Sequence, residues 1–300
     1  MNPQLLTKMI NALCIDLEPW YSAELVRRHL SKTKDAKEDQ IIESVTPILN
    51  LLDRYNTRAT FAVLGIVAEQ HPELVRAIYG KGHEIASHAY SHATLHELGK
   101  EKFEEEIGRS VKLLESITGE KPIGFRAPSF SIDNSTKWAF EILRKHGFKY
   151  DASIFPIRTR LYGMPKVPLH IYRPSMDDIT QENPGGEIIE FPMTVLRLGW
   201  NIPVAGGFYL RALPLWFLKW AIKKVNQTRP AIIYMHPWET YPKTPRLRKV
   251  SLFSKLVTYY GVGSALGKLE SLLQEFRFQP VCQVIALNFN PDFQNGCKLQ

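Results

Sequence analysis

The sequence predicts an α/β fold in which parallel strands alternate with helices. Short apolar runs with strand character recur along the chain, amphipathic helical segments follow them, and chemically active side chains stand where the runs end. Alternation of this kind over 300 residues indicates either a βα barrel or a doubly wound sheet. We favour the barrel, because barrel enzymes gather their functional residues in the loops that follow the carboxyl ends of the strands.

The predicted elements follow from hydrophobic periodicity and from helix-stop signals. Apolar runs predict strands at residues 12–17, 59–64, 84–87, 124–126 and 231–235. A period near 3.6 predicts helices at residues 41–55, 72–79, 102–118, 136–146 and 215–225. The stretch 158–201 is rich in proline and glycine and is expected to be irregular. No linker, low-complexity tract or internal repeat interrupts the chain.

Composition and charge restrict the class of protein and its partners. With 44% hydrophobic and 23% charged residues, the chain has the make-up of a globular protein rather than a disordered one. A net charge of +8 favours anionic partners, but the basic residues form no nucleic-acid-binding module, so we expect no nucleic acid. The densest basic run, Lys243 to Lys255, predicts a solvated face, with contact to a membrane surface as the alternative.

The termini and the cysteines bear on location. The first residues lack a charged segment followed by an apolar one, which predicts no signal peptide. No apolar run reaches the roughly 18 residues that a membrane span needs. Three cysteines without CxxC spacing predict neither a disulfide framework nor a cysteine-bound zinc. We therefore expect a cytoplasmic protein.

Two histidines give the strongest local signal for a metal site. The segment SHAYSHATLH places His88 and His92 four residues apart. Imidazoles at that spacing converge on one ion if the segment is helical or tightly turned. Spacing alone does not separate this reading from a pair of solvated or core histidines.

Two carboxylates stand at the end of the first predicted strand. Asp16 and Glu18, in IDLEPWY, are two residues apart, so both side chains point to the same face while Leu17 points away. One carboxylate can then bind a metal while the other acts as a base. The alternative is a pair of strand-end acids that only begin a loop.

Other strand ends carry a histidine, an arginine and an aspartate. His236 directly follows the apolar run 231–235, Arg126 lies in GFRAPSF and Asp151 in YDASIFP. We expect Arg126 to pair with Asp16, and Asp151 to pair with His236. A hydrogen-bonded structural histidine and structural ion pairs are the alternatives.

Taken in order, these segments resemble the NodB-like polysaccharide deacetylases, carbohydrate esterase family 4. GHEIASHAYSH is similar to the second motif of that family, FRAP to the third, YDAS to the fourth and YMHP to the fifth. The segments YDASIFPIRTRLYGMP, AGGFYLRALPLW and IIYMHPWETYPKTPRLR resemble the branch associated with exopolysaccharide production and exosortase loci. The resemblance covers roughly residues 10–285. It implies a single domain over residues 1–300, built as a distorted (β/α) barrel of about seven strands.

The resemblance also implies a mechanism and a substrate class. It assigns a divalent ion, with Zn²⁺ expected, to Glu18, His88 and His92, and the roles of base and acid to Asp16 and His236. Arg126 would orient Asp16, Asp151 would favour the protonated form of His236, and a backbone N–H near Ser129 would stabilise the oxyanion. The expected substrate is an N-acetylated polysaccharide or lipid-linked oligosaccharide in exopolysaccharide biosynthesis.

The first motif departs from the family. Many members carry adjacent aspartates there, whereas Leu17 follows Asp16, so Glu18 has to replace the second aspartate. The alternatives to a glycan deacetylase are a small-molecule amidohydrolase or deformylase on the same fold, and a carbohydrate-binding relative without activity. Oligomeric state is not predicted.

Overall fold

The computed structural model describes residues 9–30, 39–159, 162–204, 206–247, 249–290 and 293. Its main sheet contains the strands β1 (Ile10–Leu17), β2 (Thr60–Val63), β3 (Glu84–Ser87), β4 (Gly124–Phe125), β5 (Tyr150–Asp151), β6 (Ile189–Glu190), β9 (Ile232–Met235) and β10 (Arg277–Gln279). A separate antiparallel hairpin is formed by β7 (Val195–Leu198) and β8 (Trp200–Pro203). The helices are α1 (Glu24–Leu30), α2 (Ile41–Arg54), α3 (Gly65–Gln70), α4 (Pro72–Gly80), α5 (Leu95–Thr118), α6 (Trp138–Lys145), α7 (Phe208–Ala212), α8 (Leu215–Val225), α9 (Leu252–Tyr259), α10 (Ser264–Leu273) and α11 (Val281–Asn288).

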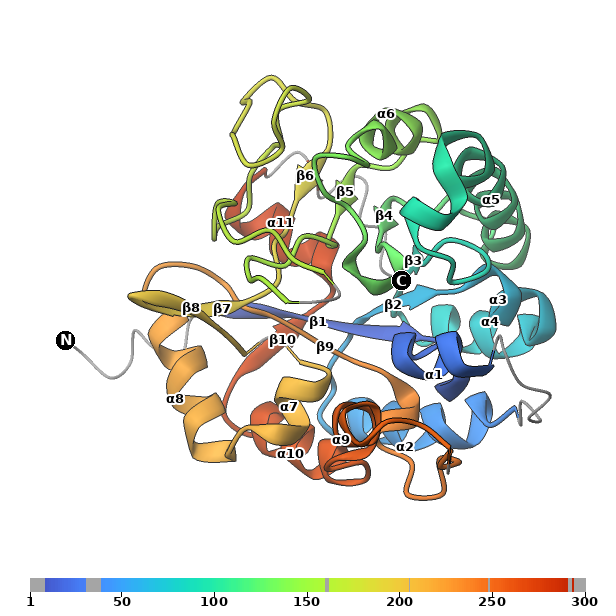
Figure 1. Ribbon diagram of the computed structural model, residues 1–300, viewed down its shortest axis with the longest axis vertical. Helices are drawn as coiled ribbons and strands as arrows, with labels where there is room; N and C mark the ends of the chain where they lie inside the picture. The colour runs from blue at the N-terminus through green and yellow to red at the C-terminus, as the bar shows by residue number, and fades with distance from the viewer. Residues whose placement is uncertain are drawn as a thin grey trace.

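The sheet is a curled, open barrel of parallel strands with helices around the outside (Figure 1). Seven strands follow one another in the order β9, β1, β2, β3, β4, β5, β6, and the short β10 pairs with the first residues of β1. All of these pairings are parallel. The predicted distorted (β/α) barrel is confirmed.

The alternation of side chains along β1 explains how the first strand serves both the core and the site. Leu13, Ile15 and Leu17 pack into the cluster formed with the outer helices, including Val45 and Ile48 of α2. The intervening Ala12 and Cys14 face the barrel interior and are small. Because side chains alternate along a strand, Asp16 continues the interior row at its carboxyl end. The strand thus presents a carboxylate above an apolar interior.

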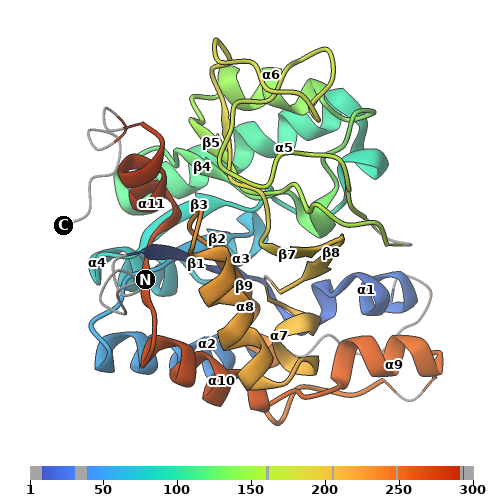
Figure 2. The same ribbon diagram turned by 90° about the vertical axis from the view of Figure 1, so that its left-hand side faces the viewer.

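Figure 2 shows the barrel from the side. The carboxyl end of β1 points toward the side of the molecule that carries α1, α9 and the β7–β8 hairpin. The opposite end is filled by α11, whose Val281, Val284 and Ile285 pack against Ala12 and Cys14. The carboxyl ends of the strands are therefore the end left for a functional site.

The sheet does not close between β6 and β9, and side-chain hydrogen bonds bridge the opening. Thr194 Oγ1 accepts from the backbone N–H of Ile232 at 2.7 Å and donates to its carbonyl at 2.9 Å. Gly206 forms a parallel bridge with Tyr234 at φ +149°, and a Cβ there would lie 1.8 Å from the Tyr234 carbonyl oxygen. Only glycine fits this approach.

The predicted helices and strands are found within a few residues of their expected bounds, with two differences. Helix α5 begins at Leu95 because Thr94 and Glu97 form a capping box, and it is kinked at Gly99. The stretch expected to be irregular contains β6 and most of the β7–β8 hairpin, so that expectation was wrong there. These strands are too short for periodicity to reveal them.

Two further expectations concern the membrane and the cysteines. Within the described ranges, no helix is both long and apolar enough to cross a bilayer. Cys14 is a buried free thiol.

The Thr194 bridge leads to a stability prediction. Thr194→Val keeps the side-chain shape but leaves the N–H and C=O of Ile232 without partners, so it should lower the free energy of unfolding by about 2 kcal/mol or more. Thr194→Ser keeps the hydroxyl and should cost only about 1 kcal/mol. Urea unfolding measures both variants. Equal losses would show that the hydroxyl does not hold the opening together.

Candidate active site

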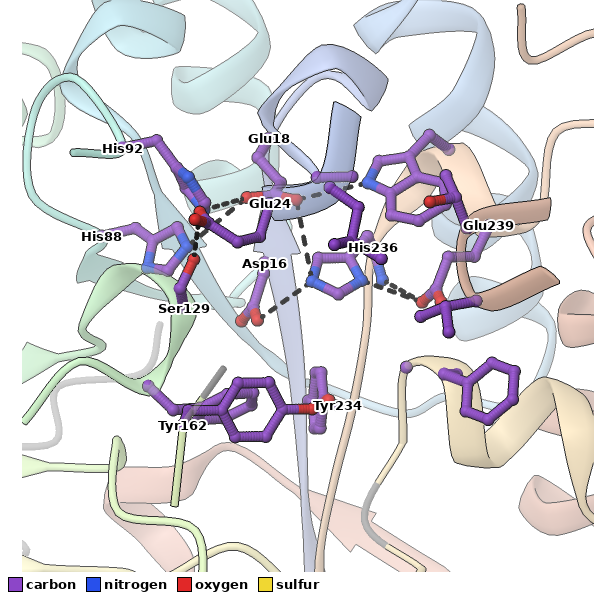
Figure 3. A pocket seen from close by; sticks show the side chains of 18 of the residues that line it. Asp16, Glu18, Glu24, His88, His92, Ser129, Tyr162, Tyr234, His236 and Glu239 are labelled. Carbon is purple, nitrogen blue, oxygen red and sulfur yellow. Dashed lines mark hydrogen bonds and ion pairs between the residues drawn. The ribbon is translucent and has the colours of Figure 1, made fainter. Parts of the chain in front are cut away.

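A pocket lies at the carboxyl ends of the strands, and its walls come from both halves of the chain (Figure 3). From the first half it is lined by Asp16 and Glu18 after β1, the histidines after β3 and the segment after β4. The second half contributes the segment after β9 and parts of α7 and α9. The predicted residues Asp16, Glu18, His88, His92, Arg126 and His236 all line this pocket, and Asp151 is the one predicted residue that does not.

Glu18, His88 and His92 form a buried cluster with the geometry of a metal site. Their ligand atoms all lie within 4.8 Å of one another. Oε2 of Glu18 is 2.6 Å from Nε2 of His92 and 3.7 Å from Nε2 of His88. Burial acts to raise the pKa of Glu18, but the adjacent His92 and His236 hold it well below its usual range. The cluster therefore contains a buried carboxylate anion.

A tight loop, not a helix, brings the two histidines together. After β3 ends at Ser87, Ala89 and His92 adopt left-handed conformations with φ of 59° and 66°. The N-terminus of α3 fixes the loop, since Gly65 N–H donates to the Ala89 carbonyl at 2.9 Å. The rings of His88 and His92 meet edge to face with centroids 5.2 Å apart. The predicted turned arrangement is thus the one that forms.

The donor set fits a divalent cation. His88 Nδ1 lies 2.7 Å from the carbonyl oxygen of Arg126, a contact that leaves Nε2 directed at the cluster. Oε2 of Glu18 is buried, and its close neighbours are the Nε2 atoms of His92 and His88. Two imidazole nitrogens and one carboxylate oxygen are the protein ligands of many catalytic zinc sites. An ion held here would bind this oxygen and both imidazole nitrogens.

Asp16 is held by a buried arginine, as the sequence predicts. Nη2 of Arg126 donates to Oδ2 of Asp16 at 3.0 Å, and Nη1 donates to the Ala152 carbonyl at 2.7 Å. The guanidinium carbon lies over the rings of Phe130 and Tyr234, at 4.7 and 4.6 Å from their centroids. Burial acts against the charged form, but Asp16 raises the pKa of Arg126 above its usual value. Arg126 is therefore a permanent cation, and it orients the Asp16 carboxylate.

His236 completes the polar side of the pocket. Its Nε2 lies 3.7 Å from Oδ2 of Asp16 and 3.7 Å from Oε1 of Glu18. The ring stacks on Trp238 with centroids 5.3 Å apart. Burial acts to lower the pKa of His236, but the charges of Glu239, Glu18 and Asp16 outweigh it and raise the pKa to about 9. At neutral pH the imidazole is therefore protonated.

Glu239 is the carboxylate that supports His236, so the predicted pairing of His236 with Asp151 was wrong. Oε2 of Glu239 lies 3.0 Å from Nδ1 of His236 and accepts from its backbone N–H at 2.9 Å. The other oxygen accepts from Nε of Arg211 at 2.7 Å. Burial would raise the pKa of Glu239, but Arg211 and His236 lower it to about 2. Glu239 stays an anion across the working range of an enzyme.

Asp151 has a different neighbourhood. It stands opposite Glu190 in the β5–β6 register, and its side chain accepts from the Ser153 hydroxyl. Burial raises the pKa of Asp151 and of Glu190, and their mutual repulsion raises that of Glu190 further. Ser153 Oγ in turn accepts from the Ala127 N–H at 2.6 Å. Asp151 therefore supports the backbone that follows Arg126.

Sequence reasoning missed several residues that line the pocket. Glu239 has a local signal, because it stands three residues after His236. Arg211 and Glu24 have none, since they come from α7 and α1. Glu24 accepts from the Ser129 hydroxyl at 3.0 Å. Ser129 itself has φ +52°, a strained conformation of the kind that gathers at active sites.

Two segments of the chain match known families. Residues 34–150 match the family described as polysaccharide deacetylase. This segment, less than half of the chain, is similar to a polysaccharide deacetylase domain. Residues 152–286 match a domain of unknown function, DUF3473. The family predicted from the sequence is confirmed, and the exopolysaccharide branch stays a prediction.

One curated relative resembles part of this chain in sequence, and two solved structures share its fold. A peptidoglycan deacetylase-like protein of Gibberella zeae is 30% identical over 176 residues, which cover 54% of this chain and 51% of that protein. The chain thus spans about half the length of this relative. A crystal structure described as a putative polysaccharide deacetylase from Mycobacterium smegmatis superposes with a TM-score of 0.59 at 18% identity, covering 90% of this chain and 85% of that one. An allantoinase superposes with a TM-score of 0.60 at 13% identity, covering 95% and 92%.

The deacetylase match does not include the whole site. Asp16 and Glu18 precede it, and His236 lies in the second matched segment. The two matched segments share one sheet, because β1 pairs with β2 and with β9. The tertiary structure therefore brings His88 and His92, which lie inside the deacetylase match, next to Asp16, Glu18 and His236, which lie outside it.

The metal cluster leads to a binding prediction. His88→Ala and His92→Ala each remove a nitrogen ligand and should raise the dissociation constant for Zn²⁺ by at least about a hundredfold. His96→Ala is the matched control, since His96 pairs with Asp133 on the surface. Isothermal titration calorimetry of metal-free protein with Zn²⁺ measures the dissociation constants. Wild-type affinity in both ligand variants would rule out this cluster.

The carboxylate behind His236 leads to a pH prediction. His236 is protonated below its pKa of about 9 and loses its proton as the pH rises through that value. Glu239→Gln removes a stabilising negative charge, so the imidazole should titrate at lower pH, with a proton affinity reduced about tenfold or more. Asp151→Asn should leave the titration unchanged. Imidazole NMR of metal-free protein measures both, and a shift in Asp151→Asn alone would contradict the assignment.

Proposed function

We propose that the protein is a zinc-dependent deacetylase that hydrolyses N-acetyl groups on a glycan. The observation that carries the proposal is the placement of an oriented carboxylate, Asp16, and a protonated imidazole, His236, beside the cluster of Glu18, His88 and His92. Amide hydrolysis needs a base to activate water and an acid to protonate the leaving nitrogen. The family match supplies the substrate class.

The metal would be held by Glu18, His88 and His92. When bound, a divalent ion polarises a carbonyl and lowers the pKa of a coordinated water. Asp16 would accept the proton of the attacking water, because the hydrogen bond from Arg126 fixes its carboxylate in position. Glu18 replaces the second aspartate of the family motif, and its pairing with both histidines supports that replacement.

His236 would donate a proton to the departing amine. Its Nε2 faces the pocket near Asp16, while Nδ1 is held by Glu239. An amine leaves poorly unless it is protonated, so the raised pKa of His236 suits this role. Glu239, fixed by Arg211, keeps the ring oriented and charged.

The substrate is proposed to be an N-acetylated polysaccharide or lipid-linked oligosaccharide used in exopolysaccharide biosynthesis by a cytoplasmic enzyme. The resemblance of the segments YDASIFPIRTRLYGMP, AGGFYLRALPLW and IIYMHPWETYPKTPRLR to that branch supports the biosynthetic role. The fold does not separate this activity from that of a small-molecule amidohydrolase, because an allantoinase has it too. A complete set of base, acid and ligands argues against a carbohydrate-binding relative without activity.

An activity panel tests the proposal. Zinc-loaded protein should release acetate from N-acetylated glycans and little acetate or formate from small amides. Asp16→Asn should lower the rate by about 10²-fold to 10⁴-fold while metal content stays unchanged. Thermal unfolding checks that this variant is folded, since Asp16 pairs with a buried arginine. Turnover of small amides alone would assign an amidohydrolase, and no turnover by loaded, folded protein would overturn the proposal.

A further inference from the structure

Helix α9 presents large apolar side chains to solvent on one face. Leu252 is 82% exposed, Phe253 59% and Leu256 51%, and Tyr260 continues the row beyond the helix at 53%. Positions i, i+1, i+4 and i+8 lie on the same side of a helix. The helix is anchored beside this face: Thr258, on the opposite side of α9, is buried, and the buried Tyr259, at the edge of the apolar row, accepts from the Leu247 N–H through its hydroxyl at 3.0 Å. A small, fixed helix therefore carries an apolar face with no covering among the described residues.

The surroundings of this face are basic. Between Thr240 and Leu269 the sequence contains six lysines or arginines and no aspartate or glutamate. Lys243, Arg246 and Lys249 are exposed in the segment that leads into α9. A short helix with an apolar face beside clustered cations is typical of segments that lie in the interface of an anionic bilayer.

The apolar face also lies at the end of the barrel where the pocket opens. Val257 and Thr258 of α9 line the pocket, and Nη2 of Arg211 donates to the Val257 carbonyl at 2.9 Å. Figure 2 shows the β7–β8 hairpin on the same side of the molecule as α9, and this hairpin carries Trp200, which is 72% exposed. Tryptophan is a frequent anchor at the level of lipid headgroups.

We propose that α9 and the basic segment before it dock this protein on an anionic membrane surface, with the pocket mouth facing the lipid headgroups. Leu252, Phe253 and Leu256 enter the boundary between headgroups and acyl chains, while Lys243, Arg246 and Lys249 contact lipid phosphates. Charge complementarity favours anionic lipid over an apolar partner protein, because the whole stretch carries only positive charge. Docking in this way is peripheral and needs no membrane span.

Vesicle flotation tests the docking. The full chain should bind vesicles of phosphatidylcholine with about 30% phosphatidylglycerol, bind pure phosphatidylcholine far less, and lose affinity as salt is raised. Lys243→Gln/Arg246→Gln/Lys249→Gln should weaken binding about a hundredfold. The matched control, Lys102→Gln/Lys112→Gln/Lys121→Gln, removes the same charge from exposed lysines on other elements and should bind nearly as wild type.

A second pair of variants tests how much the apolar face of α9 contributes to membrane binding. Leu252→Ser/Phe253→Ser/Leu256→Ser should lose binding even at low salt, whereas Ile42→Ser/Leu287→Ser, at exposed positions on α2 and α11, should not. Thermal unfolding and acetate release from a soluble N-acetylated oligosaccharide should stay at wild-type values in the α9 variant. Binding is measured without turnover, so this inference stands or fails separately from the proposed activity.

Two outcomes would overturn the docking. Wild-type protein that binds neutral and anionic vesicles equally, or that binds neither, would exclude it. A dimer seen by analytical ultracentrifugation, which the α9 triple variant dissociates while vesicle binding is absent, would assign the face to a second copy instead.

Discussion

The buried ion pair between Arg126 and Asp16 is the interaction on which the rest of the site depends. Both side chains are almost fully buried, so each charge would be costly without the other. Arg126 also donates to the Ala152 carbonyl after β5, while its own carbonyl meets Nδ1 of His88. One residue therefore joins the ends of β1, β3, β4 and β5. The buried charge of Arg126 has to be compensated by Asp16 and by backbone oxygens. Its hydrogen bonds therefore position the proposed base, His88 and the strand ends together.

Environment, rather than residue type, divides the carboxylates of the barrel into two kinds. Glu239 lies against Arg211 and His236, and its pKa falls to about 2. Asp151 and Glu190 lie against each other, and burial raises the pKa of both. The first kind supplies fixed negative charge to His236. The second supplies a hydrogen-bonded support for the segment after β4, where Ala127 donates to Ser153.

The opening between β6 and β9 allows residues from the second half of the chain to reach the site. Because β6 and β9 do not pair, Thr194 and Gly206 bridge the space and bring the residues before α7 against β9. Arg211 then reaches Glu239, and through the Val257 carbonyl it also holds α9. The carboxylate that orients His236 is thus coupled to the surface helix at the pocket rim.

The sequence by itself determined the alternation of strands and helices, the strand-end placement of Asp16, Glu18 and His236, and the pairing of Arg126 with Asp16. The elements and the strand-end positions follow from local periodicity, which is readable over a few residues. The pairing joins residues 110 apart, and it was expected because both stand at strand ends, which meet at one end of a parallel sheet. Only the tertiary structure decided that a left-handed turn brings His88 and His92 together, and that Glu239 rather than Asp151 supports His236. The reason is that β5 and β6 align Asp151 with Glu190, a register set by strands of two residues each. Arg211 and Glu24 reach the pocket from helices far away in sequence, and no local pattern encodes such contacts.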